Sequence, residues 1–316
     1  MKNIVLSLNL VIPLVFMMTV GYVSKRCGLI GDKSLTEMNK VQFRGFMSLL
    51  IFYNVYCLTP SSHGRGSLIF LSFFIIAMEI LVSWLIFRKM TKDPRQVSVL
   101  MQGTYRTNLL IFGLSVAQSL YGDGNVGEIV ILLSIIVPAF NVISVIVFEI
   151  YRGGKIHTGQ IAKGIVKNPL IVGGLFGLFF LILKLKYGIR LPKMIEDPVA
   201  TMSKAATPLA FVILGATLTF RSILKNLRLL LALNVLRLIV IPLAVITAGI
   251  RLGYRDQALI ALFGVSATPT AVSSFNMAKD MGADGDLAGE IVVTTSVFSI
   301  LTTFLWVLIL KNFGYI

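Results

Sequence analysis

Residues 103–130 read GTYRTNLLIFGLSVAQSLYGDGNVGEIV, and residues 264–292 read GVSATPTAVSSFNMAKDMGADGDLAGEIV. Both stretches contain an interrupted apolar segment, a loop rich in Gly and Asp, and a final GEIV. Gly103 precedes Asn108 by five residues, as Gly264 precedes Pro269. One interrupted apolar segment in each half of a 316-residue chain is typical of a membrane protein built from two structural repeats.

The composition places most of the chain in lipid. Apolar residues make up 56% of the sequence, charged residues 14%, and the mean hydropathy is +0.87. No soluble domain of this size could bury so much apolar surface. The runs are continuously apolar, which excludes the alternating strands of an outer-membrane barrel. Since a spanning helix needs about 20 residues, ten candidates fit, at roughly 4–23, 42–59, 67–87, 97–120, 126–149, 169–187, 198–219, 229–250, 257–279 and 288–310. We therefore expect an all-α polytopic protein.

The repeats divide the chain into residues 1–155 and 156–316, with five spans in each. The interrupted spans are the fourth and the ninth. They are five spans apart, an odd number, so the second copy crosses the membrane in the opposite direction. The sequence thus predicts an inverted repeat whose two broken helices meet near the midplane, where such folds place a ligand site.

The net charge of +15 reflects basic residues in the loops between membrane spans and does not indicate nucleic-acid binding. Of the 29 basic residues, 17 lie in one alternate set of loops and 9 in the other. The basic set is expected on the cytoplasmic side, which places both termini outside. The remaining three (Arg106, Lys204 and Arg237) lie within spans.

The residues at the breaks suit a binding site. Pro269 removes a backbone donor, and carbonyls freed there need partners that lipid cannot supply. Asn108 offers two donors and an acceptor, and half-helix N-termini favour an anionic ligand. Hydroxyl groups flank both breaks, on Thr107, Thr268, Thr270 and Ser273. The alternative for Pro269 is a structural kink, since proline is frequent in membrane helices.

Charged residues inside spans are costly and therefore functional candidates. Arg106 lies two residues from the first break, where it could hold a carboxylate; it could also bind freed carbonyls or snorkel. Glu79 could carry a proton, or form a structural ion pair with Arg237, because their spans correspond across the repeat. Both alternatives stay open.

Five fragments resemble the auxin efflux carrier family, which includes bacterial organic-acid permeases and plant auxin carriers. They are IPLVFMMTVGYVSKRCGLI, TNLLIFGLSVAQSLYGD, KNPLIVGGLFGL, TPLAFVILGATL and TPTAVSSFNMAKDMGADGDLAGEIV, spread over the whole chain. The resemblance implies ten helices in two inverted repeats, related to bile-acid and sodium/proton carriers, with helices 4 and 9 crossed. Helices 1, 2, 6 and 7 would form a scaffold, helices 3–5 and 8–10 a mobile transport part, and the molecule a homodimer.

The resemblance also assigns binding residues. Asn108 matches the crossover asparagine that contacts substrate, with Leu110 on the same half-helix and Val272 just past the second crossover. Met47 would line the scaffold wall, and Asn168 would face the pocket. This chain has Ser48, Thr107 and Ser115 where plant carriers often have proline, so its first break is expected to differ locally.

The expected function is secondary or facilitated transport of small organic anions by an elevator-type movement. The alternative is a membrane sensor or regulatory protein that keeps the carrier fold. No phosphate-binding GxxxxGK[ST] motif is present, so energy would come from gradients. Neither a catalytic set nor a metal-binding spacing of Cys and His occurs within the spans. We therefore expect no enzyme activity, cofactor or metal. We also expect the protein to lie in a bacterial inner membrane.

Overall fold

The computed structural model describes residues 2–58, 66–122, 126–152 and 158–316, and all regular elements in these ranges are helical. The elements are α1 (Lys2–Arg26), α2 (Asp32–Val41), η1 (Gln42–Phe46), α3 (Met47–Tyr56), α4 (Gly66–Met90), α5 (Pro94–Tyr105), η2 (Leu109–Gly113), α6 (Leu114–Tyr121), α7 (Gly127–Tyr151), α8 (Thr158–Lys167), α9 (Pro169–Tyr187), α10 (Lys193–Thr217), α11 (Phe220–Lys225), α12 (Leu227–Val235), η3 (Leu236–Val240), α13 (Ile241–Arg251), α14 (Asp256–Ser266), α15 (Ser273–Asp280) and α16 (Gly285–Asn312). The boundary predicted at 155/156 lies outside the described residues.

Six helices in the described part of the chain are long and apolar enough to cross a membrane: α4, α7, α9, α10, the continuous α12–η3–α13 helix, and α16. This confirms an all-α, polytopic membrane protein. Two shorter apolar helices, Leu109–Tyr121 and Asp256–Ser266, belong to the interrupted segments. The complete ten-span inverted repeat stays a prediction.

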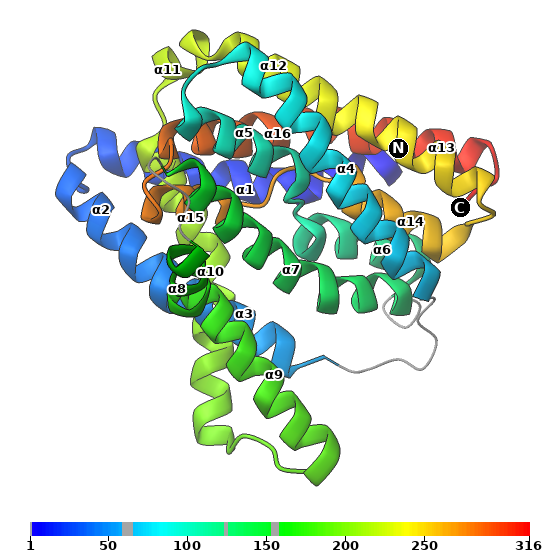
Figure 1. Ribbon diagram of the computed structural model, residues 1–316, viewed down its shortest axis with the longest axis horizontal. Coiled ribbons are helices and arrows are strands. Elements are labelled where there is room, and N and C mark those ends of the chain that lie inside the picture. The colour runs from blue at the N-terminus through cyan, green and yellow to red at the C-terminus, as the bar shows by residue number, and fades with distance from the viewer. Residues whose placement is uncertain (1, 59–65, 123–125, 153–157) are drawn as a thin grey trace.

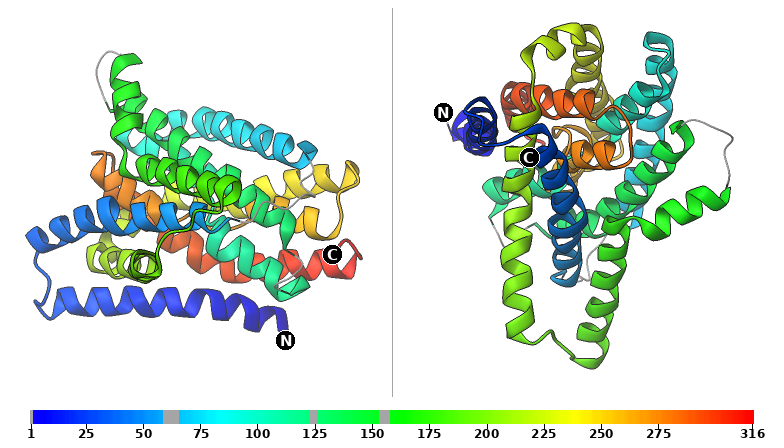
Figure 2. Two further views of the ribbon diagram at one scale, coloured as in Figure 1. Left: turned by 90° about the horizontal axis from the view of Figure 1, so that it is seen from below. Right: turned by 90° about the vertical axis from the view of Figure 1, so that its left-hand side faces the viewer.

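The two chain ends lie toward one end of the helical array (Figures 1 and 2). Helices α1, α4, α11 and α15 finish at the opposite end (Figure 1), and each has basic residues in its last turn. We call these two ends the terminal end and the basic end. Cationic side chains stabilise helix C-termini, so these residues suit the helix ends at which they lie.

Glycines allow the close packing of α1 on α10 and of α3 on α9. A Cβ on Gly215 would overlap the backbone carbonyl of Met18, and a Cβ on Gly21 that of Val212. Gly173, four residues before Gly177 on α9, similarly approaches the backbone of α3. Small residues at this spacing let membrane helices approach backbone to backbone. The four helices expected to form the scaffold therefore lie in two tight pairs, and α3 also packs on α10.

The GEIV sequences begin helices in different ways. Glu128 lies in the first turn of α7, where a negative charge is favourable. Glu290 lies one turn further into its helix, because α16 begins five residues earlier, at Gly285. The Glu290 carboxylate is buried and accepts hydrogen bonds from Ser222 and from Asn226, the latter at 2.8 Å. It therefore anchors the α11–α12 turn to α16.

Candidate functional site

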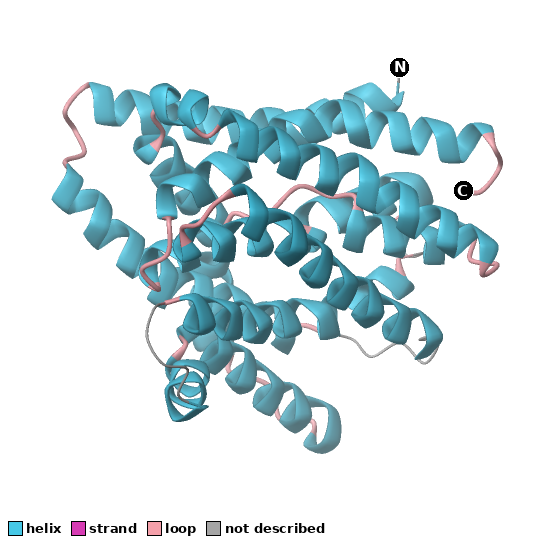
Figure 3. Ribbon diagram, turned by 45° about the horizontal axis from the view of Figure 1, so that its top comes forward, coloured by secondary structure: helices cyan, strands magenta, loops and turns pink. Residues whose placement is uncertain are grey.

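The two interrupted segments cross inside the helical array, and Figure 3 shows their loop backbone running between the helices. The backbones pair as a short antiparallel bridge between Thr107 and Thr270. Asn108 N donates to Pro269 O at 2.8 Å, and Ala271 N donates to Arg106 O at 3.2 Å. Backbone groups freed from the helices thus satisfy one another, which lipid could not do. Proline suits position 269 because only its carbonyl oxygen takes part, as a hydrogen-bond acceptor, and no N–H donor is needed there.

Arg237 binds the carbonyls at the ends of both preceding half-helices. Its Nε and Nη2 donate to Thr268 O at 3.1 and 2.9 Å, and Nη1 donates to Thr104 O. The side chain is completely buried and belongs to the π-helical segment η3. Thr270 adds a hydrogen bond from Oγ1 to Gly103 O at 2.7 Å. A cation is favourable at helix C-termini, so Arg237 holds the ends of α5 and α14 together.

Glu79 of α4 is the acidic group that interacts electrostatically with Arg237. Its side chain is buried, and neither carboxylate oxygen has a hydrogen-bond partner among the described residues. Within those residues no direct Glu79–Arg237 ion pair is formed, since the guanidinium donates to backbone carbonyls instead. Glu79 therefore lies behind the crossing as an incompletely compensated buried carboxyl group.

Arg106 holds its guanidinium among neutral groups. Nη2 donates to Asn141 Oδ1 at 2.6 Å and to Ser273 Oγ at 3.1 Å, and Nη1 donates to Ser144 Oγ at 3.1 Å and contacts Met277 Sδ at 3.1 Å. The side chain is 3% exposed, and no described carboxylate lies within ion-pair distance of it. A desolvated cation held only by neutral partners is expensive, and an anion would compensate it.

Asn108 begins the second half of the first interrupted segment. Its Oδ1 accepts from Ile111 N at 3.4 Å, which makes it the N-cap of η2. Asn108 Nδ2 donates to no described residue, and the buried Thr107 Oγ1 has no partner in that part of the chain. The crossing therefore offers one amide donor and one hydroxyl group that the described residues leave unused.

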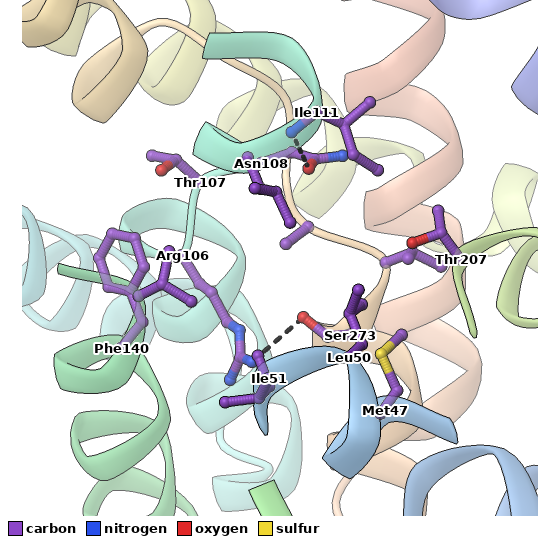
Figure 4. Close-up of a pocket in the computed structure, with 14 residues that line it drawn as sticks. Met47, Leu50, Ile51, Arg106, Thr107, Asn108, Ile111, Phe140, Thr207 and Ser273 are labelled. Carbon is purple, nitrogen blue, oxygen red and sulfur yellow. Dashed lines mark hydrogen bonds between the residues drawn. The ribbon is translucent and has the colours of Figure 1, made fainter. Parts of the chain in front are cut away.

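These groups form one wall of a cavity of about 60 Å³. Figure 4 shows Arg106 and Asn108 on one side and Met47 and Leu50 of α3 on the other. The complete lining is Met47, Leu50, Ile51, Arg106, Thr107, Asn108, Leu110, Ile111, Val137, Phe140, Thr207, Ala271, Val272 and Ser273. Since pockets for drug-sized ligands measure about 300–1,000 Å³, this one suits a small molecule with one polar end and an apolar body.

The structure separates the predicted site residues into three groups. The cavity is lined by Met47, Arg106, Thr107, Asn108, Leu110, Val272 and Ser273. Behind the lining, the crossing is built by Pro269, Thr268, Thr270 and Arg237, with Glu79 beside Arg237. Asn168 is not in the lining; its Oδ1 caps α9 by accepting from Leu170 N at 3.0 Å and Ile171 N at 3.4 Å.

Sequence reasoning missed the partners of Arg106 on α7 and the α10 residue Thr207. Asn141 and Ser144 lie three residues apart in a mostly apolar helix, and such a pair shares one helix face. That spacing could have indicated a polar partner for a charged neighbour. Thr207 gave no comparable signal, because Thr201 and Ser203 precede it closely and nothing distinguishes it from them.

Comparison with known proteins agrees with this architecture. A family model described as membrane transport protein matches residues 6–307. A protein of Methanothermobacter thermautotrophicus described as an uncharacterized transporter is 22% identical over 307 residues, covering 96% of this chain and 98% of that protein. Both descriptions point to a transporter rather than an enzyme. Because the family match spans nearly the whole sequence, the chain belongs to the membrane transport protein family, the auxin-efflux-carrier-like family that its fragments resemble.

Proposed function

We propose that the protein is a secondary or facilitative transporter of small organic anions such as auxin-like or dicarboxylic acids. The observation that carries the proposal is the buried Arg106 guanidinium at the cavity wall, surrounded by neutral side chains. A substrate carboxylate would supply the missing charge. Arginine suits this task because its planar donors bind a carboxylate in bidentate fashion.

The remaining lining defines the rest of the ligand. Asn108 Nδ2 is an unused donor two residues from Arg106, and the η2 half-helix begins beside it, so its N-terminus adds positive potential. Opposite these groups the wall is apolar, with Met47, Leu50 and Ile51. The lining thus supports an acid whose carboxylate lies at the crossing and whose apolar part faces α3.

Alternating access would move the crossing relative to α3. In this proposal α1, α3, α9 and α10 form the scaffold, and the interrupted helices with α4, α7, α12–η3–α13 and α16 form the transport part. Arg44 of η1 and Asp280 of α15 make an ion pair of 3.3 Å across this division. Because Arg44 is exposed, a pair of this kind contributes only about 0–1 kcal/mol, so it can break during each elevator-type cycle. The proposed assembly is a homodimer built on the scaffold.

Glu79 and Arg237 are the proposed coupling residues. The buried Glu79 carboxyl group has no hydrogen bond to a described residue and interacts electrostatically with Arg237. Ionisable groups buried inside membrane proteins often serve in ion or proton relays. The proposal also places the protein in a bacterial inner membrane with both termini outside, and needs neither a cofactor nor a nucleic-acid partner.

Uptake into proteoliposomes tests the proposal. Radiolabelled malate and indole-3-acetate represent the two acid classes. Wild-type protein should transport at least one of them, and Arg106→Gln should raise its half-saturating concentration about 10–100-fold, as expected for losing a charged hydrogen bond of about 1.5–3 kcal/mol. Arg228→Gln is the control, since Arg228 is exposed on α12. Transport of neither acid, or equal kinetics in Arg106→Gln and wild type, refutes the proposal.

A further inference from the structure

A second cavity, of about 630 Å³, lies at the basic end where α1, α2, α10, α15 and α16 meet. Its lining is Tyr22, Lys25, Arg26, Asp32, Leu35, Thr36, Ala216, Thr217, Leu218, Thr219, Lys279 and Asp286. Three cations and two carboxylates leave this lining with one net positive charge. A single anion would balance it.

Lys279 is the cation in this lining that lacks a close partner. Lys25 Nζ forms an ion pair with Asp32 Oδ1 at 2.5 Å, and Arg26 Nε donates to Tyr22 OH at 3.1 Å. The half-buried Lys279 ammonium makes no hydrogen bond or ion pair with a described residue. Asp286 and Asp32 of the same lining attract it electrostatically without forming an ion pair, and the centre of the Phe275 ring is 5.6 Å from Nζ. The ammonium is therefore available to an anion in the cavity.

The same two helices wall both cavities. On α15, Ser273 lines the cavity at the crossing and Lys279 lines the one at the basic end; on α10, Thr207 and Ala216 do the same. Six residues of α-helix span about 9 Å, so the two sites on α15 lie within about two turns of each other. Helices α10 and α15 also contact each other.

Buried side-chain amide groups with unused hydrogen-bonding capacity lie on α15, α2 and η1, between the two cavities. Asn276, between Ser273 and Lys279 on α15, is completely buried, and neither its Oδ1 nor its Nδ2 has a partner in the described part of the chain. Asn39 Oδ1 and Gln42 Oε1, on α2 and η1, are also buried without partners there. Both α2 and η1 pack on α10 and α15. Unpaired buried amides are costly, so water or a polar solute entering this seam would be stabilised.

We propose that the cavity at the basic end is a second anion site, in which Lys279 binds the substrate carboxylate as it passes between the crossing and the basic face. This inference rests on the proposed function, and it assigns to the same substrate a binding step on one side of the membrane only. Arg106 acts at the crossing from both sides, whereas Lys279 acts during entry from, or release to, the basic end.

Transport kinetics with defined sidedness test the proposal. Uptake and efflux are measured in proteoliposomes whose orientation is known from labelling Cys27, which follows α1 at the basic end, with an impermeant thiol reagent in a Cys57→Ala background. Lys279→Gln should raise the half-saturating concentration about tenfold from the basic side and less than twofold from the terminal side, and Lys279→Arg should restore it. Lys40→Gln, an exposed change on α2 outside the lining, should alter neither. Equal changes from both sides, or none, overturn the proposal.

Equilibrium binding separates this inference from the proposed function. Detergent-purified wild-type protein should bind labelled malate or indole-3-acetate at two sites per chain. Arg106→Gln should remove one site and Lys279→Gln the other. If Lys279→Gln removes no site, the inference is wrong whatever transport shows. If wild-type protein transports neither acid but binds one in a Lys279-dependent manner, the proposed function fails and the second site stands.

Discussion

Arg237 is the residue on which the crossing depends most, and Arg237→Met tests this. The guanidinium donates to Thr104 O and Thr268 O at the ends of two half-helices. Methionine fills similar space but donates nothing, so two buried carbonyl groups lose this partner. Each unsatisfied group costs about 1–3 kcal/mol, which gives about 2–6 kcal/mol in total. Removing the cation also leaves the Glu79 carboxyl group without its nearby charge.

Thermal unfolding in detergent is the appropriate assay for Arg237→Met. With an unfolding entropy of about 2.1 cal/mol/K per residue, a chain of 316 residues loses roughly 1.5 °C of Tm per kcal/mol, so Arg237→Met should lower Tm by at least about 3 °C. Arg237→Lys should recover part of the loss, because one ammonium retains the charge but cannot reproduce the planar donors. Arg251→Gln, an exposed change at the end of the same continuous helix, should have little effect. A Tm for Arg237→Met within about 1 °C of wild type would show that the crossing does not need this cation.

Two further outcomes follow from the structure. Gly215→Ala should lower thermal stability by about 1–3 kcal/mol, the usual cost of overpacking, because the added Cβ overlaps the Met18 carbonyl. Gly45→Ala is the control, since a Cβ there meets nothing within 4 Å, and it should destabilise much less. Equal losses of stability in the two variants would show that α1 and α10 do not pack this closely. Glu79→Gln should abolish the dependence of uptake on a pH gradient while binding persists, and a variant that keeps full pH dependence would exclude Glu79 from coupling.

The sequence predicted the crossing better than its surroundings. The spacing of Gly103 to Asn108 and of Gly264 to Pro269 located both interruptions, because loss of helical hydrogen bonding has a local cause. It could not show that the two extended segments pair through Thr107 and Thr270, since such pairing depends on tertiary contacts.

The sequence did not predict the hydrogen-bond partners of the buried charged residues. Sequence correspondence paired Arg237 with Glu79, but the guanidinium donates to carbonyls of residues 104 and 268 instead. Backbone acceptors carry no signature in the side-chain sequence, which is why this contact was not predicted. Asn168 similarly was expected at the pocket from resemblance alone, whereas the Asn-Pro pair forms a local cap for α9, an arrangement typical of helix N-termini.

We propose that a carboxylate binds at the crossing between Arg106 and Asn108. An experimental structure of the protein with a brominated carboxylic acid tests it directly, because bromine can be located independently of the protein atoms. We expect the carboxylate within hydrogen-bond distance of the Arg106 guanidinium and the bromine toward Met47 and Leu50. An acid that competes with the transported substrate but binds away from Arg106, with that guanidinium still held only by neutral side chains, would contradict it.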